Sequence, residues 1–334
     1  MDEYLAALEA ELRALVATPD PVYAAYYGMF HYHMGWTDTR FNAIAIEAGK
    51  RIRPLLCLRA CEAVGGEWRS ALPVAAAIEL AHNFSLIHDD IEDQSDERRG
   101  RAAVWKVWGL AQGLNAGDGM FVLARLALDR LRGFPIEQCS AISSVFDQAT
   151  LALCQGQFLD LGFEARLDVT EEEYMRMIRG KTAALMSAAM RMGAMLGTGD
   201  QTVVAALARF GENIGLAFQI TDDILGIWGE PTVTGKSAAT DILSRKKSLP
   251  AILGLSHSQY GSALREMYSA PRMEDAHVAR VLELLDAAGV REATQRRADE
   301  FRAAALDALD ATGIQNHAMD YLREITNAMT RRVR

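Results

Sequence analysis

Apolar residues recur at helical spacing along nearly the whole chain of 334 residues. No segment alternates apolar and polar residues over any length, as a half-buried strand would. The chain has only 8 prolines, and it is rich in Ala, Leu, Glu, Arg and Met, which favour helices. No linker rich in Ser, Pro or Gly divides it, and no repeat of fixed period is present. The sequence therefore predicts an all-α fold in which residues 1–334 form a single large helical domain.

The expected helices are bounded by glycine, proline and capping residues. They cover about 2–16, 54–64, 70–93, 101–108, 115–131, 137–163, 171–179, 182–196, 201–228 and 250–256, followed by two or three charged amphipathic helices within 274–332. The aromatic segment 22–36 lacks a regular period, and we expect it to wrap an edge of the protein. Residues 235–247 are polar and break the helical pattern, which indicates a loop between two helices.

Net charge and composition limit the classes of ligand that the chain is suited to bind. The chain carries 35 Lys and Arg against 44 Asp and Glu, a net charge of −9. An acidic chain is poorly suited to nucleic acid or an anionic membrane, so we expect a small-molecule ligand and no nucleic-acid partner. Met1-Asp2-Glu3 does not resemble a secretory signal, and no uninterrupted apolar run approaches the ~20 residues of a membrane span. We therefore expect a cytoplasmic protein without a membrane span.

The strongest local signal is the run His88-Asp89-Asp90-Ile91-Glu92-Asp93. On a helix, Asp89 and Asp93 lie about 40° apart, and Asp90 falls within about 100° of them. Residues 74–87 before them are almost wholly apolar, so we expect this helix face to lie inside the protein. Carboxylates gathered there repel one another and lose hydration, a cost that a bound divalent cation removes. Oxygen ligands of this kind suit Mg²⁺, although a solvated acidic helix end would show the same run.

A second acidic pair, Asp222 and Asp223, lies inside another apolar segment, FQITDDILG. Two such pairs on two apolar helices are hard to explain as independent surface features. If the two helices face each other in a bundle, the pairs would hold a metal cluster between them.

Basic residues accompany the acidic pairs along the chain. The groups are Gly49-Lys50-Arg51-Ile52-Arg53-Pro54, Arg98-Arg99-Gly100-Arg101, Lys181-Thr182, and the loop lysines Lys236, Lys246 and Lys247. Each alone could be a solvated surface charge. Together with the acidic pairs they indicate a polyphosphate ligand, bound partly through Mg²⁺ and partly by Arg and Lys.

In this order the motifs resemble those of the trans-polyprenyl diphosphate synthases, which include farnesyl and geranylgeranyl diphosphate synthases. The resemblance covers about residues 45–260, with further helices over about 261–334. It matches Asp89-Asp90-x-x-Asp93 with Arg98-Arg99-Gly100 to the first aspartate-rich motif, and Asp222-Asp223 to the second. The other matched groups are Gly49 to Pro54, Gln155-Gly156-Gln157, Lys181-Thr182 and Gly235-Lys236. The resemblance implies a helical bundle of the isoprenoid synthase type with a central apolar cavity.

The resemblance also implies a role for each matched residue. Ligands of three Mg²⁺ ions would be Asp89, Asp93 and Asp222, supported by Asp90 and Asp223. The allylic diphosphate would contact Arg98, Lys181, Thr182, Gln219, Lys236 and Lys246. Isopentenyl diphosphate would contact Lys50, Arg53, His82 and Arg99. Catalysis would then depend on Asp89, Asp90, Asp93, Lys181, Asp222 and Asp223.

The implied reaction is the condensation of isopentenyl diphosphate with an allylic diphosphate. The allylic C–O bond ionises, the isopentenyl double bond attacks the cation, and a proton is lost. The chain offers no obvious dedicated base for that proton, and the released pyrophosphate is the family's usual candidate. A homodimer is expected by resemblance alone.

The chain departs from the family pattern at three places. Gly226 stands where the second motif usually has a third Asp, so we expect activity to survive with weaker Mg²⁺ affinity. Ala48 replaces a second glycine before Gly49, with little expected effect. Arg245-Lys246-Lys247 replaces a Gly-Lys-Thr-like stretch, which leaves open which lysine reaches phosphate.

Product length is the least determined property. Phe84 lies five residues before Asp89, roughly 7.5 Å along a helix, at the depth where this family often has a wall that stops chain growth. Phe84, with the small Ser85 beside it, favours a C20 product and then a C15 product, although Phe84 could also be an ordinary core residue.

Two other functions remain open. A class I terpene cyclase would ionise an allylic diphosphate without a second substrate, and it would have no use for Lys50, Arg53, His82 and Arg99. A non-catalytic subunit of a heteromeric synthase would typically have lost the acidic motifs, whereas both Asp pairs are intact here.

Overall fold

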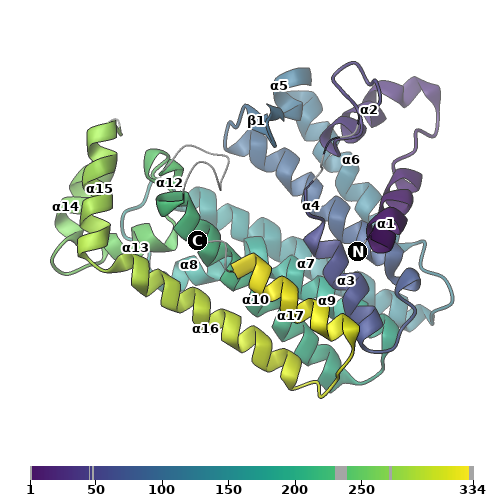
Figure 1. Ribbon diagram of the computed structural model, residues 1–334. Helices are drawn as coiled ribbons and strands as arrows, with labels where there is room; N and C mark the ends of the chain where they lie inside the picture. Colours follow the sequence, from purple (N-terminus) through teal and green to yellow (C-terminus); the bar gives the residue numbers. More distant parts are fainter. Residues whose placement is uncertain (1, 45, 47–48, 230–238, 271–272, 331–334) are drawn as a thin grey trace. The chain divides into compact units, whose positions relative to one another are not determined.

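The computed structural model describes residues 2–44, 46, 49–229, 239–270 and 273–330, and Figure 1 shows that helices dominate them. The chain divides into two compact units. Unit 1 comprises residues 1–147 and 189–204, and unit 2 comprises residues 148–188 and 205–334. The all-α prediction is confirmed. The expectation of a single domain stays a prediction.

Unit 1 contains most of the N-terminal half. Its complete elements are α1 (Asp2–Leu15), η1 (Pro21–Tyr23), α2 (Ala24–His33), α3 (Ile52–Ala63), η2 (Trp68–Ala71), α4 (Leu72–Glu92), β1 (Glu97–Arg98), β2 (Arg101–Ala102), α5 (Val104–Trp108) and α6 (Leu110–Leu128). Three helices have residues in both units: α7 (Ile136–Phe163), α9 (Ala184–Gly197) and α10 (Gln201–Trp228).

Helix α4 is the central element of unit 1 and packs against α3 and α6. Its residues from Val74 to Ala81 are buried, including three successive alanines. The facing helix α6 buries Gly113, Ala116 and Gly117, so small side chains let the two helices approach closely. The acidic run lies at the end of α4, whose C-cap is Asp93.

The aromatic segment 22–36 differs from its expected irregular form, because Ala24–His33 is a helix. Met29, Phe30 and Tyr32 are buried on different sides of it. A helix enclosed on several sides needs no polar face, so its sequence shows no amphipathic period. The expectation of an irregular segment was therefore wrong for residues 24–33, and its position at an edge stays a prediction.

A short hairpin replaces the start of the helix expected over 101–108. Arg98 pairs with Arg101 and Glu97 with Ala102, both antiparallel, and the helix α5 begins only at Val104. The two turn residues, Arg99 and Gly100, both have positive φ, which is the geometry of a tight two-residue hairpin turn. These are the only paired strands among the described residues.

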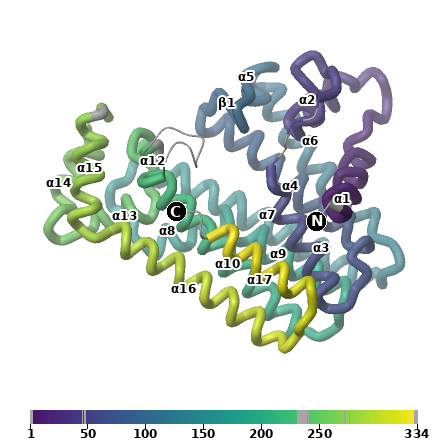
Figure 2. The backbone as a smooth tube through the Cα atoms, viewed as in Figure 1, coloured from purple at the N-terminus to yellow at the C-terminus, as the bar shows by residue number. Residues whose placement is uncertain are grey.

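Unit 2 contains the C-terminal half. Its complete elements are α8 (Glu171–Ile178), the π-helical segment η3 (Arg179–Ala183), α12 (Thr240–Leu243), α13 (Leu249–Leu255), α14 (Gly261–Ser269), α15 (Asp275–Ala287), α16 (Val290–Asp310) and α17 (His317–Thr330). The charged helices expected within 274–332 are thus α15, α16 and α17. Figure 2 shows α16 and α17 running side by side, and residues of the two helices are in contact.

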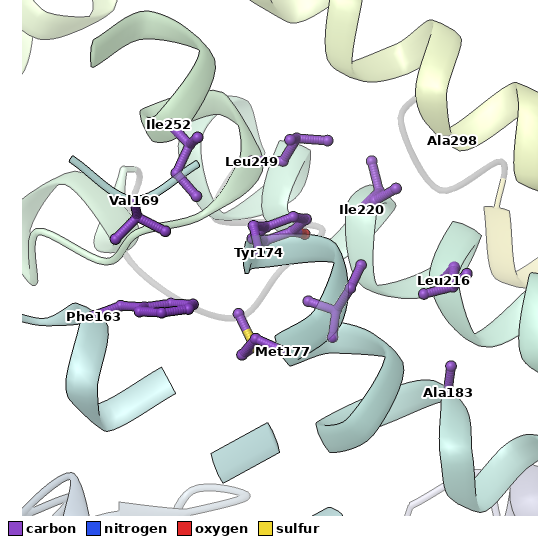
Figure 3. Close-up of a cluster of buried hydrophobic side chains, with 11 residues drawn as sticks. Phe163, Val169, Tyr174, Met177, Ala183, Leu216, Ile220, Leu249, Ile252 and Ala298 are labelled. Atoms are coloured by element: carbon purple, nitrogen blue, oxygen red, sulfur yellow. The ribbon is translucent and has the colours of Figure 1, made fainter. Parts of the chain in front are cut away.

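The core of unit 2 gathers around Tyr174 on α8. Figure 3 shows its ring among Leu249, Ile220 and Met177, with its hydroxyl at the end of the ring. Tyr174 is 1% exposed, and the neighbouring members of the cluster are similarly buried. Helix α8 begins with a capping box, in which Thr170 and Glu173 exchange hydrogen bonds with each other's backbone. This cap fixes the start of the helix that carries Tyr174 into the core.

Two stretches, Trp68–Glu92 and Gln201–Trp228, are long and apolar enough by composition to cross a membrane. Each contains polar residues, so neither is an uninterrupted apolar run. Within their apolar windows, 67% and 56% of residues are buried inside the protein, as in core helices. The absence of a membrane span stays a prediction.

The cap of α8 predicts a pH-dependent stability. Hydrogen bonds from Arg166, and from the backbone of Thr170, lower the pKa of Glu173 from 4.5 to about 2. Because the folded pKa is the lower one, the stabilisation is complete above about pH 4.5 and is lost as the pH falls towards about 2. Glu173→Gln should therefore be less stable than wild type near neutral pH, and the difference should shrink on acidification.

Urea unfolding at a series of pH values measures this difference. The matched control is Glu266→Gln on an exposed position of α14, whose difference from wild type should not change with pH. A Glu173→Gln difference that stays constant down to about pH 3 would contradict the expected coupling.

Candidate active site

The first acidic motif occupies the last turn of α4, where its three carboxylates have different surroundings. Asp90 is 1% exposed, Asp89 is half-buried and Asp93 is exposed. The Oδ1 atom of Asp90 accepts hydrogen bonds from Arg98 Nε at 2.9 Å and from a terminal nitrogen of Arg98 at 2.5 Å, whereas Oδ2 has no hydrogen-bond partner among the described residues. Burial raises the pKa of Asp90, although the Arg98 charge acts to lower it. A buried carboxylate oxygen without a partner is a place where a cation or a water would be favourable.

The β1–β2 turn lies beside the basic segment that opens α3. The Arg99 guanidinium lies 3.6 Å from where a Cβ on Gly49 would be. On α3, a terminal nitrogen of Arg53 lies 3.2 Å from His82 Nε2 on α4. Burial, and then the charges of Arg53 and Arg99, hold the pKa of His82 well below its usual value. The structure therefore brings Arg53, His82 and Arg99 into one electrostatic neighbourhood, and it leaves Lys50 exposed.

Two further residues belong to this neighbourhood, and neither was assigned a site role from the sequence, although Arg51 lies in the basic segment named there. Arg51 forms an ion pair with Glu79 at 2.5 Å, with both side chains buried. His33 is buried, and burial, followed by the charges of Arg99 and Arg98, holds its pKa well below its usual value. Glu79 was the available signal, because a single acid within the apolar run of α4 needs a buried partner.

Phe84 and Ser85 lie one turn before the acidic motif. Phe84 is 7% exposed, and its ring lies 5.2 Å from that of Phe121 on α6 and 5.9 Å from that of His88. The Ser85 hydroxyl donates to the His82 carbonyl at 2.8 Å. Phe84 thus belongs to an aromatic group between α4 and α6.

The second acidic motif lies near the end of α10 in unit 2, where Asp223 is tightly held. Its carboxylate accepts from the Tyr174 hydroxyl at 2.6 Å, from Gln219 Nε2 at 3.0 Å and from the Leu249 backbone N–H at 3.0 Å. Burial, and then the charge of Asp223, raises the pKa of Tyr174 well above its usual value, so this phenol stays a donor. Asp223 is therefore an anchor that ties α8, α10 and α13 together, while Asp222 beside it is half-buried.

Lys181 is presented by the π-helical segment η3, which passes very close to α7. A Cβ on Gly156 would lie 2.2 Å from the Lys181 backbone nitrogen, so only glycine permits this approach. The Lys181 ammonium donates to Asp160 on α7 at 2.6 Å. The neighbouring Thr182 hydroxyl donates to Gln219 at 2.7 Å, which links η3 to the Asp223 anchor. π-Helical turns of this kind are frequent at functional sites.

A small pocket lies among these groups. It is lined by Asp160, Tyr174, Met177, Ile178, Lys181, Gln219, Asp223 and Lys246. Burial by itself lowers the pKa of Lys246, but the carboxylates around it, Asp223 first and then Asp241, raise it above its usual value. Lys246 is therefore a permanent positive charge in the pocket.

The structure distinguishes the two adjacent loop lysines. Lys247 is 4% exposed and donates to the backbone carbonyls of Glu164 at 3.0 Å and Arg245 at 2.9 Å. These bonds tie the segment after α12 to the end of α7. Lys246, in contrast, lines the pocket. Lys236 lies outside the described residues.

The donor set of both motifs suits Mg²⁺. Among the described residues, no three His, Cys, Asp or Glu side chains are grouped closely enough to hold a metal ion by themselves. Four carboxylates, Asp160, Asp222, Asp223 and Asp241, act on Lys246, so negative charge exceeds the charge of the two pocket lysines. Mg²⁺ takes oxygen ligands and usually completes its shell with water and substrate phosphates, so a site of this composition fits it.

Asp160 and Tyr174 are further site residues that sequence reasoning missed. Asp160 lies three residues after Gln157 in the GQFLDLG stretch, and its charge within the largely apolar residues 148–163 was a usable signal. Tyr174 gave no such signal, because its partner Asp223 is far away in the sequence.

Comparisons with known proteins agree with the motifs. The family model "Polyprenyl synthetase" matches residues 35–285. The (2E,6E)-farnesyl diphosphate synthase of Mycobacterium tuberculosis is 39% identical over 303 residues, covering 89% of this chain and 83% of that protein. The geranylgeranyl diphosphate synthase of the same organism is 41% identical over 285 residues, covering 84% of this chain and 80% of that protein.

The fold is also shared with solved structures. The polyprenyl synthetase of Streptomyces coelicolor aligns with a TM-score of 0.90 and 34% identity, over 98% of each chain. The helical architecture, the matching family model and these relatives confirm the resemblance that the motifs indicated. The chain belongs to the polyprenyl synthetase family and is a short-chain trans-prenyltransferase.

Proposed function

We propose that this prenyltransferase condenses isopentenyl diphosphate with allylic diphosphates of C5 to C15 and that geranylgeranyl diphosphate (C20) is its main product, followed by farnesyl diphosphate (C15). The observation that carries the two-substrate reaction is a cationic cluster in each unit. Unit 2 has Lys181 and Lys246, and unit 1 has the cluster around Arg53, His82 and Arg99. A reaction with two diphosphates needs two sets of cations, whereas a terpene cyclase needs one.

Unit 2 supplies the groups that we assign to the allylic diphosphate. Lys181 and Lys246 bring two positive charges to the pocket. Thr182, Gln219 and Asp223 form a chain of hydrogen bonds. This chain joins η3, which carries Lys181, to α10 beside the pocket. Charges held in place before ionisation stabilise the leaving diphosphate without reorganisation, which is the main electrostatic contribution to such a reaction. We assign Arg98 to the same substrate.

The metal role is assigned to Asp89, Asp93 and Asp222. When bound there, Mg²⁺ neutralises the charge that develops on the leaving diphosphate, and the family resemblance implies three ions. Asp90, held through Oδ1 by Arg98, and Asp223, held by three donors, support this metal shell. The presence of both Asp pairs also favours a catalytic protein over a non-catalytic subunit.

Unit 1 supplies the groups that we assign to isopentenyl diphosphate. Because the pKa of His82 lies well below its usual value, its ring is neutral at physiological pH. A neutral imidazole can accept a hydrogen bond from Arg53 through Nε2, and this orients the guanidinium. Arg99 and the exposed Lys50 add further charge. We propose that the released pyrophosphate takes the proton lost after the double bond attacks.

Incorporation of labelled isopentenyl diphosphate, with Mg²⁺ and with C5, C10 or C15 primers, tests this proposal. We expect elongation that stops mainly at C20. A hydrocarbon or alcohol formed from an allylic diphosphate alone would make the protein a cyclase. No turnover of any primer would favour the non-catalytic subunit.

We also propose a cytoplasmic homodimer. Its support is the family resemblance together with an unusual surface on α6, where Leu110, Leu114, Val122 and Leu126 are all exposed. Their spacing places them on one side of the helix, and an exposed apolar stripe of this kind suits a helix-packing partner.

We expect the same substitution to lower activity at Lys246 and to lower stability at Lys247. Lys246→Met should lower kcat/KM by on the order of 100-fold, because it removes a charge from the diphosphate pocket. Lys247→Met should retain most activity but lose about 1–3 kcal/mol of stability, because two partly buried hydrogen bonds from a charged donor are lost. Steady-state kinetics and urea unfolding of both variants measure this. Equal kinetic losses would contradict the assignment of Lys246.

Substitutions at Phe84 and Ser85 should change product length in opposite directions. Phe84→Ala should yield products longer than C20, because it removes the ring that lies against Phe121 and His88. Ser85→Phe should shift the products towards C15, because it adds a ring at the same depth. Chromatography of the products from a C15 or C10 primer reads the lengths. Thermal unfolding checks that each variant is folded, and an unchanged product distribution in both would exclude this wall.

A further inference from the structure

Gly226 on α10 and Asp241 on α12 share one small volume of unit 2. A Cβ built on Gly226 would lie 2.4 Å from Asp241 Oδ2, 2.5 Å from Cγ and 2.8 Å from Oδ1. Real Cβ atoms essentially never come this close to other heavy atoms. The whole carboxyl group of Asp241 therefore lies directly over the Cα of Gly226, where the first atoms of any other side chain would be.

The position of Gly226 gives this contact its meaning. Gly226 follows Asp222 by four residues on the same helix, so the two positions lie on one face, one turn apart. A side chain at 226 would extend beside that of Asp222. The carboxyl group that occupies this volume comes from another element, α12.

The backbone around Asp241 is held in an unusual conformation. Helix α12 has only four residues, and the residues near its two ends, Ala239 and Arg245, have φ values of +57° and +55°. The Lys246 backbone N–H donates to the Asp241 carbonyl at 2.9 Å. Left-handed conformations of residues other than glycine persist only where the surroundings enforce them, and they gather at functional sites. The fold therefore specifies where Asp241 lies.

Asp241 also belongs electrostatically to the diphosphate pocket. Together with Asp222, Asp223 and Asp160 it is among the charges that raise the pKa of Lys246. A carboxylate in this group that is held close to Asp222 is suitably placed to order water bound to a cation there.

We propose that Asp241 supplies from α12 the third carboxylate that the second aspartate motif lacks on α10, and that Gly226 is required because only glycine leaves room for it. The inference rests on the proposed function, in which Asp222 binds a divalent cation together with a diphosphate. Asp241 then acts as a positioning residue for that cation and its water. Gly226 is thus part of the site, although it has no side chain.

The test measures cation demand without turnover. Inorganic pyrophosphate is added at saturation, and the Mg²⁺ concentration that gives half of the maximal thermal stabilisation is determined for each variant. Asp241→Asn, which preserves shape, should raise that concentration by about 10–100-fold, the usual effect of removing an outer carboxylate from a metal site. Gly226→Asp should also raise it, because the new side chain displaces Asp241 and adds a repelling charge.

The double variant Gly226→Asp/Asp241→Ala separates this inference from a general loss of structure. It places a carboxylate at position 226 on α10 and removes the one at position 241 on α12. Its Mg²⁺ demand should therefore return towards the wild-type value. Melting in the absence of Mg²⁺ reports the intrinsic stability of each variant. The control is Glu266→Gln, an exposed acid of unit 2 that should leave the Mg²⁺ demand unchanged.

Two results would overturn the inference while leaving the proposed function intact. One is an Asp241→Asn protein with wild-type Mg²⁺ demand. The other is a Gly226→Asp protein that needs less Mg²⁺ than wild type. That result would mean that Gly226 only removes the third carboxylate of the motif and has no role in making room for Asp241. Failure of wild type to gain any Mg²⁺-dependent stability with pyrophosphate would overturn the inference together with the metal part of the proposed function.

Discussion

The structure depends on how carboxylates are kept charged on largely apolar helices. A carboxylate removed from water must recover its lost hydration from donors or cations, or it becomes neutral. Asp223 recovers it fully, through a phenol, an amide and a backbone N–H that come from α8, α10 and α13. Satisfying this one group therefore determines how three helices of unit 2 pack.

Asp90 in unit 1 shows a different solution of the same problem. Arg98 satisfies one oxygen, and the other has no donor among the described residues. A cation or a water can supply the missing interaction there. A catalyst that must stabilise a departing diphosphate benefits from this arrangement, because its charges are already held in place before the substrate ionises.

Close approaches of the backbone set the positions of the charged groups. The contact of Gly156 with η3 places Lys181 against Asp160, and the open volume at Gly226 admits the carboxylate of Asp241. In both cases the functional group comes from one element and the glycine that makes room for it from another. The two relatives in Mycobacterium tuberculosis, a farnesyl and a geranylgeranyl diphosphate synthase, have similar identity to this chain. Overall similarity therefore does not decide product length, and the role of Phe84 stays a prediction.

The sequence by itself determined the all-α class, the bounds of most long helices and the family, because helical periodicity and the two acidic motifs are local patterns. It did not determine the helix of residues 24–33, since a helix enclosed by aromatic packing has no polar face to reveal its period. It also missed the β1–β2 turn, which depends on two positive φ values. Only the tertiary structure separated Lys246 from Lys247 and brought Tyr174 to Asp223 and Asp241 to Gly226. The two contacts join residues that are not neighbours in the chain, and the two lysines are adjacent residues of the same type. Local sequence spacing contains no information about either kind of difference.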